Sequence, residues 1–419
     1  MSCLPTEIVM KIFIYSLSFS ISDNSSQNWP TLLSAQRRPL PSQPPYVLTE
    51  VCQTWRKIAF ATPELWEALL FVERDVPESQ EHFSKLRCNV LSWFSRTTSQ
   101  RLSFSASLRP HHFSRSNITS RVPWRRLAHL YLKDDALCPL DLTKMLHECP
   151  GLITCHIEGI NCVEIALTSL TLKHIQTVEL PRLTSLTLTV TKNWTELSLS
   201  KPNSLYIFPG LLSTPSLTTL EINGHPDVSY DYILTQIILG MLVNCNAPLT
   251  RLCLHNLNPI YFFDYFVDMW TIQHLSLSPK DEDCWTFGTF FQRLAYDINL
   301  AQNILPNLVA LHLEATVPRR ENEPPRFDRA LAWDSAILDM VTTRRWKRGA
   351  YPHREEGLCQ LRELHVLWRG RTWSGSDSAP LHKALDLAND GLDMEYPSLG
   401  VSADWPVDLL EKLLKEILI

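Results

Sequence analysis

The sequence predicts an α/β protein in which a small all-helical module at the N-terminus precedes a solenoid of repeated strand-and-helix units. Two observations carry this prediction. Near the N-terminus, apolar residues fall at helical spacing in two stretches, Leu4 to Phe19 and Leu48 to Phe60. From Leu127 onward, a hexapeptide of the form L-x-x-L-x-L recurs, mostly every 23 to 36 residues, which is the length of one strand plus one helix or loop.

The composition is that of a globular protein with a sizeable core, because 45% of the 419 residues are hydrophobic. Glycine is scarce, with 12 residues, which argues against folds built on glycine-rich phosphate-binding loops. The formal net charge of −5 is too small to indicate a nucleic acid or an acidic substrate as partner. No apolar run approaches the roughly 18 residues of a membrane span, so we expect no membrane partner.

The cysteines indicate the compartment. Eleven of them are scattered singly, in odd number and without a C-x-x-C pair. This usage is typical of a reducing environment rather than of a disulfide framework. We therefore expect a cytoplasmic or nuclear protein.

The helical module is expected to occupy residues 1–66. Its first helix is predicted from Leu4 to Phe19. The segment from Ser20 to Tyr46 is polar and rich in proline, which predicts a disordered loop between the two helical stretches.

The second helix of the module is predicted over Leu48 to Phe60 and ends near Ala61. Pro63 cannot continue a helix, and it forces the preceding Thr62 out of the helical region. Thr62 and Pro63 then serve as cap and first turn of a new short helix that presents Trp66.

Residues 67–419 form the predicted solenoid. Its first strands are expected at ALLFVE, which begins at Ala68, and at RLSFSASL from Arg101 to Leu108. A helix is predicted between them, from Pro77 to Arg96. One such unit cannot bury its apolar residues alone, so neighbouring units stack and their short strands align into a parallel sheet.

Eight hexapeptides predict the later strands, beginning at Leu127, Leu152, Leu183, Leu217, Leu249, Ile272, Leu308 and Leu361. Two related segments begin at Leu167 and Ile175. A proline stands two residues before several hexapeptides, as if a helix were stopped before each strand, at Pro150, Pro181, Pro215 and Pro306.

The stretches between strands predict helices on the outer face of the solenoid, over Asp141 to Glu148, Tyr230 to Asn244, Phe287 to Asn299 and Arg329 to Arg345. The basic run from Arg344 to Arg348 is interpreted as a solvated helix C-terminus rather than a site for an acidic partner or nucleic acid. Late helices are expected at Leu381 to Leu392 and at Pro406 to Ile419, the last as a cap on the sheet edge.

Two segments carry a family resemblance. LPTEIVMKIFIYSL, which begins at Leu4, and VCQTWRKIAFATPELW, which begins at Val51, resemble the two halves of an F-box of the type common in fungal proteins. The insert from Ser20 to Tyr46 is longer than the loop of a compact F-box. The repeats resemble degenerate leucine-rich repeats found behind F-boxes, because the asparagine of the regular repeat is mostly missing, although Asn256 lies close to its expected place.

The F-box resemblance implies that the module docks on the Skp-type adaptor of a cullin-based ubiquitin ligase. The candidate contact residues are Leu4, Pro5, Ile8, Ile12, Phe13, Val51, Cys52, Trp55, Pro63, Leu65 and Trp66. The alternative is that most of them pack the small helices on each other or on the solenoid. Leu4 and Pro5 are the best candidates for exposed contacts, whereas Trp55 is expected in the internal core.

On each strand the leucines are expected to point inward and the intervening residues to face solvent on the concave side. These intervening residues form a candidate surface for a protein substrate: His129, Tyr131, His156, Thr187, Glu221, Arg251, His274, Ser276, His312, Glu363 and His365. Histidines of adjacent strands lie close enough to suggest a metal site, but paired His/Cys spacing is absent and no metal is predicted.

No catalytic residues or cofactors are predicted, because no nucleophile-elbow, phosphate-loop or H-E-x-x-H motif is present. The main hypothesis is thus a non-enzymatic substrate receptor of a Skp/cullin/F-box ligase. Two alternatives stay open. One is a repeat scaffold for protein interactions without a ligase role, and the other is a hydrolase or transferase hidden among degenerate repeats.

Overall fold

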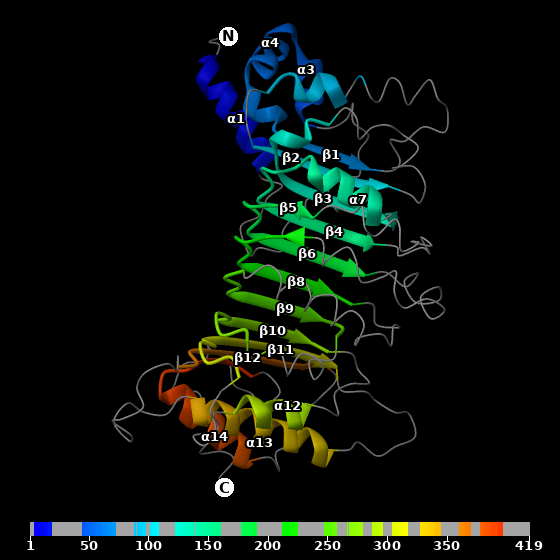
Figure 1. Ribbon diagram of the computed structural model, residues 1–419. Coiled ribbons are helices and arrows are strands. Elements are labelled where there is room, and N and C mark those ends of the chain that lie inside the picture. Colours follow the sequence, from blue (N-terminus) through cyan, green and yellow to red (C-terminus); the bar gives the residue numbers. More distant parts are fainter. Residues whose placement is uncertain are drawn as a thin grey trace, which may run out of the picture. The chain divides into compact units, whose positions relative to one another are not determined.

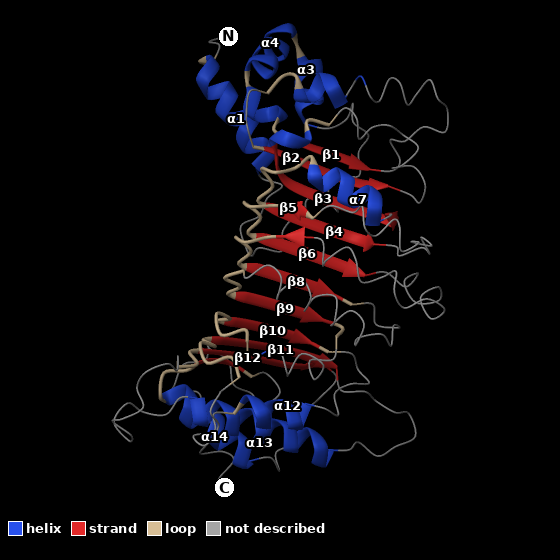
Figure 2. Ribbon diagram, in the orientation of Figure 1, coloured by secondary structure: helices blue, strands red, loops and turns tan. Residues whose placement is uncertain are grey.

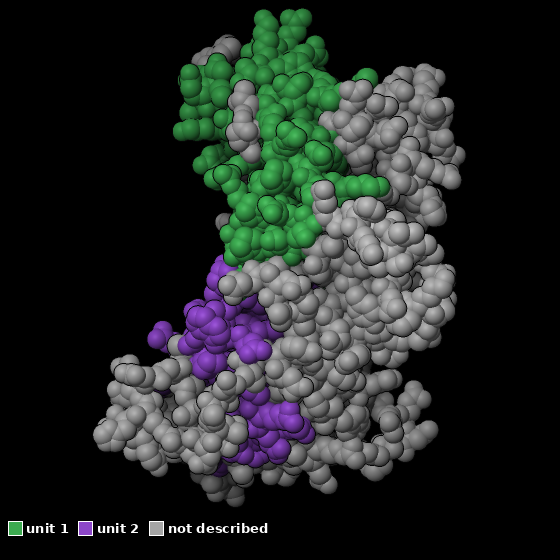
Figure 3. Space-filling model, viewed as in Figure 1, with its two compact units in different colours: residues 1–217, 240–247 green, residues 218–239, 248–419 purple. Residues whose placement is uncertain are grey.

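A computed structural model shows an α/β protein dominated by a parallel sheet of eleven strands (Figure 1, Figure 2). It describes residues 4–18, 44–72, 88, 90–97, 101–108, 122–137, 139–160, 177–190, 212–224, 247–257, 266, 268–279, 287–295, 304–316, 327–344, 360–369 and 378–396. The chain divides into two compact units, residues 1–217 with 240–247 and residues 218–239 with 248–419 (Figure 3). The predicted boundary at residue 66 falls inside the first unit, which holds the helical module together with the first strands.

The helical module consists of α1 (Thr6–Ser18), α3 (Pro44–Val51), α4 (Gln53–Ala61) and the short 3-10 helix η2 (Pro63–Trp66). The first predicted helix, the end at Ala61 and the new helix at Pro63 are confirmed. The predicted loop from Ser20 to Tyr46 lies outside the described residues, except that its last three residues already belong to α3.

The prediction of one continuous helix over Leu48 to Phe60 is wrong, because the chain breaks at Cys52. This residue is extended, with φ −160° and ψ 170°, and its Sγ accepts a hydrogen bond from the backbone N of Trp55 at 3.4 Å. A side chain that accepts from the third residue of a helix satisfies one of its unpaired N–H groups. Cys52 is therefore the N-cap of α4 and separates it from α3.

The first unit contains five strands of the sheet, in the order β1 (Ala68–Val72), β2 (Leu102–Leu108), β3 (Leu127–Leu137), β4 (Thr154–Ile160) and β6 (Ser185–Val190). The pairing places buried residues in one row across them, namely Leu69, Phe104, Leu130, Cys155 and Leu186. The 3-10 helix η5 (Trp124–Arg126) precedes β3, and α7 (Pro139–His147) follows it.

One prediction for the first unit differs in detail from the structure. The segment at Ile175 gives β5 (Val178–Glu179), which pairs with β7 (Leu212–Ser213) in a separate two-stranded parallel sheet. Of the helix predicted from Pro77 to Arg96, residues 88 and 90–94 are helical, whereas residues 77–87 and 89 lie outside the described residues. The hexapeptide at Leu167 lies outside the described residues.

The second unit contains the remaining six strands, in the order β8 (Thr219–Asn223), β9 (Arg251–His255), β10 (His274–Ser278), β11 (Ala310–Thr316), β12 (Glu363–Arg369) and β13 (Asp393–Glu395). Their register again aligns one buried row, which is Leu220, Leu252, Leu275, Leu311, Leu364 and Met394. All eight hexapeptides from Leu127 onward are thus confirmed as strands, whereas β13 carries no such motif.

The helices of the second unit are α12 (Phe287–Leu294), α13 (Phe327–Arg344) and α14 (Ser378–Asn389). They confirm three of the predicted helices, although α12 ends earlier than expected. The helices predicted over Tyr230 to Asn244 and Pro406 to Ile419 lie outside the described residues.

A repeated β-turn leads into the strands. The backbone N of the first hexapeptide residue donates to the carbonyl three residues earlier, at 3.1 Å in the turns that start at Cys149, Leu180, Thr214 and Leu305. Proline is the second residue of each, and its fixed φ suits that position. The four prolines therefore shape turns. Within the described residues, Pro150 follows the helix α7, but Pro181 and Pro215 follow the short strands β5 and β7, so the expectation that each proline stops a helix is wrong for these two.

Side chains connect successive repeats at these turns and beyond the strands. Ser216 donates from Oγ to the carbonyl of Pro181 at 2.7 Å, and Asn307 donates from Nδ2 to the carbonyl of Trp270 at 2.7 Å. At the other end of the strands, Asn256 has φ 54° and donates from Nδ2 to the carbonyl of Gly224 at 3.1 Å. A Cβ on Gly224 would lie 2.7 Å from the carbonyl oxygen of Asn256, so the close approach requires glycine.

Arg344 departs from the interpretation of the basic run as solvated, whereas the rest of the run, residues 345–348, lies outside the described residues. Its side chain is buried and donates from Nε to the carbonyl of Leu294 at 2.8 Å and from Nη1 to the carbonyl of Leu305 at 2.8 Å. Nη2 donates to the carbonyl of Ile304. Burial lowers the pKa of this guanidinium to about 10, so it stays charged at neutral pH. The end of α13 is thereby tied to the end of α12 and to the turn before β11.

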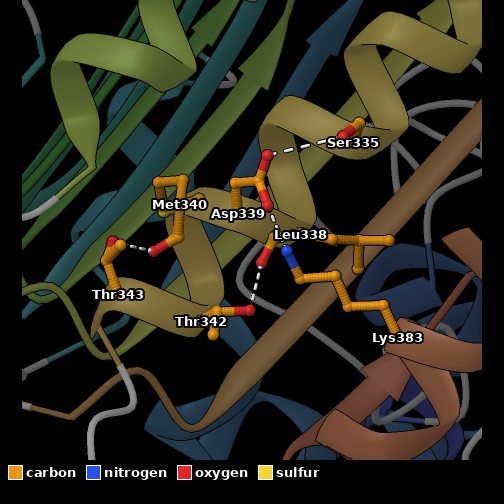
Figure 4. Close-up of polar contacts among 7 residues, drawn as sticks. All are labelled: Ser335, Leu338, Asp339, Met340, Thr342, Thr343 and Lys383. Carbon is orange, nitrogen blue, oxygen red and sulfur yellow. Dashed lines mark hydrogen bonds and ion pairs between the residues drawn. The ribbon is translucent and has the colours of Figure 1, made fainter.

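Polar contacts also link α13 with α14 and the chain after β13. Asp339 of α13 pairs with Lys383 of α14 and accepts a hydrogen bond from Ser335 (Figure 4). Deeper in the unit, the buried hydroxyl of Tyr396 donates to the buried carboxylate of Asp334. These contacts fix the C-terminal helices of the second unit to each other.

Candidate protein-binding surfaces

An apolar stripe runs along α1 and the residues before it. Leu4 is 58% exposed, Ile8 43%, Ile12 48% and Tyr15 63%. Their spacing of four, four and three residues places them on one side of the helix. Large exposed apolar patches of this kind are typical of binding sites. We name these four residues the α1 stripe.

Further exposed residues lie on the other helices of the module. Val47 and Val51 of α3 and Phe60 of α4 are exposed apolar side chains, and Pro5 and Cys52 are exposed as well. Of the predicted adaptor contacts, the structure therefore exposes Leu4, Pro5, Ile8, Ile12, Val51 and Cys52. Tyr15, Val47 and Phe60 are exposed as well but were not among the predicted contacts, although the helical spacing of Tyr15 relative to Ile8 and Ile12 was a usable signal.

The remaining predicted contact residues hold the module together. Phe13, Leu65 and Trp66 are buried, and Pro63 is half-buried. Trp55 packs its ring edge-on against Phe13, with the ring centroids 4.9 Å apart, which agrees with an internal role. These side chains support the exposed surface from below rather than forming it.

An aromatic cluster joins the module to the segment before β2. The ring of Trp66 lies 5.1 Å from that of Trp93 and 5.4 Å from that of Tyr46, measured between centroids. Its Nε1 donates to the carbonyl of Ala59 at 2.9 Å. The guanidinium of Arg96 lies over the same ring, 4.4 Å from its centroid. Edge-to-face aromatic pairs and a cation over a ring both add to the burial energy, so this junction is a well-packed part of the first unit.

The predicted substrate surface lies on one face of the strands, opposite the buried leucines. In the second unit it forms two adjacent rows, because the register pairs Glu221, Cys253, Ser276, His312 and His365 in one line and Arg251, His274 and Glu363 in the next. In the first unit the register aligns His156 with Thr187. His129, His156 and Thr187 are half-exposed, as are most of these residues in the second unit.

Tyr131 departs from the expectation that it faces solvent, because it is buried. Its hydroxyl donates to Oε2 of Glu158 at 2.6 Å, and its ring lies 4.6 Å from that of His156. Burial, together with this hydrogen bond, raises the pKa of Tyr131. Burial also acts to raise the pKa of Glu158, but the hydrogen bonds from Lys133 and Tyr131 outweigh it and lower the pKa. Tyr131 therefore orders the surface rather than offering a free hydroxyl.

Three side chains of the second unit converge. One ring nitrogen each of His312 and His365 and one carboxylate oxygen of Glu363 all lie within 4.8 Å of one another. The two imidazole rings lie 4.5 Å apart between centroids. Nδ1 of His365 also forms a hydrogen bond with Oε2 of Glu395 at 3.0 Å. All three residues belong to the predicted surface row, where convergence of histidines from adjacent strands was considered, but the register of β11 and β12 decides which of them meet.

The described cysteine thiols are free, and three of them lie in or near the sheet. Burial raises the pKa of Cys149 to about 12 and that of Cys253 to about 11, and it also raises the pKa of Cys155. These three thiols therefore stay protonated at neutral pH, whereas a nucleophilic cysteine requires the thiolate.

His255 makes stability depend on pH. Burial lowers its pKa below 6.5, although Glu221 and Glu314 act in the opposite direction. The unfolded chain then binds this proton more readily than the folded one, so the contribution of His255 to stability is complete above about pH 6.5 and declines as the pH falls toward the folded pKa. We expect the urea midpoint of the wild type to fall more between about pH 7.5 and pH 5.5 than that of His255→Gln, in which this group no longer titrates. If the urea midpoints of the wild type and of His255→Gln fell equally, the expectation would be contradicted.

Within the described ranges, no helix has both the length and the apolar character needed to cross a membrane. Compared with protein-family models, the chain matches none, and it matches none of the curated proteins.

Proposed function

We propose that the protein is a non-catalytic substrate-recognition subunit of a Skp/cullin/F-box ubiquitin ligase. In this proposal the helical module binds a Skp-type adaptor and, through it, a cullin. The polar face of the strands binds a protein substrate, and the complex acts in the cytoplasm or the nucleus.

The observation that carries the proposal is the two-sided apolar character of α1. This helix of 13 residues buries Val9 and Phe13 inside the module but exposes Ile8, Ile12 and Tyr15, the part of the α1 stripe that lies on the helix. Covering an apolar side chain is worth about 1.5 to 3 kcal/mol relative to leaving it exposed, so a stripe of this size favours a stable partner. The residues that form it belong to the segment that resembles the first half of an F-box.

The repeated strands support the second half of the proposal. The structure has the features of stacked repeats, namely aligned leucine rows, a recurring turn before the strands and side-chain hydrogen bonds between turns. We propose that these repeats form a leucine-rich-repeat solenoid whose alternating polar face is the concave one. Such a surface suits an extended protein surface better than a small molecule.

In the proposed mechanism the protein positions the substrate and carries out no chemistry itself. Holding a substrate and the ligase on one chain makes ubiquitin transfer between them effectively intramolecular, which raises its rate without any catalytic group on the receptor. The aromatic cluster around Trp66 would supply a rigid support for the adaptor-binding helices on the first strands.

A repeat scaffold without a ligase role is the second candidate. It is favoured by the burial of Phe13, Leu65 and Trp66, because these residues of the F-box-like segments are used for internal packing. In that case α1 and α3 would cover one end of the repeats and would have no affinity for the adaptor.

A pull-down with a purified Skp-type adaptor separates the two candidates. The intact chain is expected to bind, whereas the combined variant Leu4→Asp with Pro5→Asp is expected to bind at least about 100-fold more weakly, because it places two charges at the start of the α1 stripe. Trp270→Asp is the matched control, since Trp270 is an apolar side chain of the second unit with 62% exposure. Undiminished binding of the combined variant, or no binding by the intact chain, would reject the ligase proposal.

A further inference from the structure

The cluster of His312, Glu363 and His365 lies where β11 and β12 pair. His312 and His365 are direct neighbours in the register, and Glu363 stands opposite Ala310, one step along the same face. Ring nitrogens and a carboxylate oxygen from the three residues already lie within 4.8 Å of one another. Three potential metal ligands thus point to one place on the surface of the second unit.

Glu395 orients one of these ligands. It lies on β13 directly beside His365 and accepts the hydrogen bond from Nδ1 at 3.0 Å. This arrangement assigns the proton to Nδ1 and leaves the lone pair on Nε2 for a metal. Histidines that bind metals usually donate their other N–H to a carboxylate in this way, which fixes the ring and makes it a stronger ligand.

We propose that His312, Glu363 and His365 bind a zinc ion, with Glu395 as the residue that positions His365. Two imidazoles and one carboxylate form a ligand set typical of borderline divalent transition metals, and they leave a fourth position for water or for a group of a bound protein. Calcium and magnesium are disfavoured, because they prefer sites made of oxygen ligands.

Zinc binding requires the three ligand atoms to move only slightly closer together. Ligands bound at about 2.0 to 2.1 Å in tetrahedral arrangement are about 3.3 Å apart. His312 is exposed and Glu363 is half-exposed, so side-chain rotation can close the remaining distance without moving the strands. The carboxylates of Glu363 and Glu395 favour a cation at this place, whereas Arg251 on β9 and His274 on β10 lie near His312 and oppose it.

Zinc binding would change the proposed substrate surface. The ion would connect β11 with β12, and the hydrogen bond to Glu395 would extend the connection to β13. It would also hold three polar side chains of two neighbouring strands in one arrangement. This inference does not rest on the ligase proposal, because it concerns only the second unit and is tested without an adaptor.

The test is a titration of the full-length, EDTA-treated protein with zinc chloride in competition with a chromophoric indicator. The wild type is expected to have one zinc site that is tighter than any other zinc site on the chain. His312→Ala and His365→Ala are expected to weaken that site at least about 100-fold, and Glu395→Gln about 10- to 100-fold. His156→Ala is the matched control, because His156 is a half-exposed histidine on a strand of the first unit, and it should leave the affinity unchanged.

Two further measurements keep the test independent of folding defects. Circular dichroism should show wild-type spectra for the variants, and His312→Gln provides a second substitution at the exposed position. Cobalt(II) added in place of zinc should give the visible absorption bands of a four- or five-coordinate site in the wild type, and these bands should be lost in His312→Ala, His312→Gln and His365→Ala. Two results would overturn the proposal. One is an unchanged zinc affinity in His312→Gln and His365→Ala. The other is a wild-type dissociation constant weaker than about 10 μM, which corresponds to a binding free energy near −7 kcal/mol.

Discussion

Replacing Trp66 with alanine is expected to lower the free energy of unfolding by about 3 to 5 kcal/mol, as is usual for a fully buried tryptophan. The side chain has no exposed surface and contacts the rings of Tyr46, Phe60 and Trp93. Its removal also deprives the carbonyl of Ala59 of the Nε1 donor. Urea denaturation followed by circular dichroism measures the loss, and a shift worth less than about 1 kcal/mol would contradict this description of the junction.

A matched pair of variants isolates the hydrogen bond of Trp66. Trp66→Phe and Trp93→Phe remove the same atoms from two buried rings. However, Nε1 of Trp93 has no hydrogen-bond partner in the part of the chain that the structure describes. Trp66→Phe should therefore cost about 1 kcal/mol more than Trp93→Phe, which is the usual net value of one hydrogen bond. Equal losses would show that the bond to Ala59 contributes nothing.

Replacing Arg344 with methionine is expected to destabilise the second unit by about 3 to 5 kcal/mol, because it removes three hydrogen bonds from a buried charged donor to main-chain carbonyls; that of Leu305 keeps the turn bond from the backbone N of Leu308. Those carbonyls belong to Leu294, Ile304 and Leu305, at the end of α12 and in the turn before β11. Methionine keeps most of the side-chain volume, so the loss reports the hydrogen bonds rather than a cavity. The measurement is the urea midpoint of the second unit.

Lys383→Met is the control for this substitution. Lys383 forms an ion pair with Asp339 in the same helical part of the unit (Figure 4), but the two side chains are 34% and 61% exposed. Exposed ion pairs contribute at most about 1 kcal/mol. If Lys383→Met were as costly as Arg344→Met, burial of the guanidinium would not be the cause of the effect.

The strands could be predicted from the sequence because each carries its own signal. In a hexapeptide such as LTTLEI at Leu217, the alternation of leucine with polar residues reports which side of the strand is buried. The helices α1 and α13 were predicted for the same reason, with a period of 3.6 residues. Such local patterns need no knowledge of the neighbouring chain.

Features that depend on distant partners could not be predicted. The burial of Arg344 is decided by carbonyls of residues 294, 304 and 305, and the burial of Tyr131 by Glu158. The convergence of His312 with His365 depends on the register of two strands separated by a long connection. The break at Cys52 was missed because the apolar spacing continues through it, and cysteine is an unusual N-cap.

The exposure of the candidate adaptor contacts was predicted in part. Leu4, Ile8 and Ile12 are exposed as a docking surface requires, whereas Phe13 lies on the inner side of the same helix. A resemblance to a motif identifies which residues belong together, but helical phase decides which of them face solvent. The difference between Ile12 and Phe13 is a rotation of about 100° around the helix axis.

The central claim is that the α1 stripe and α3 form the docking surface for a Skp-type adaptor. Hydrogen–deuterium exchange of the intact chain, with and without saturating purified adaptor, tests it most directly. The claim predicts slower exchange in peptides that cover α1 and α3, with no change in peptides that cover β8 to β12. Protection confined to the strands of the second unit, or no protection anywhere, would contradict it.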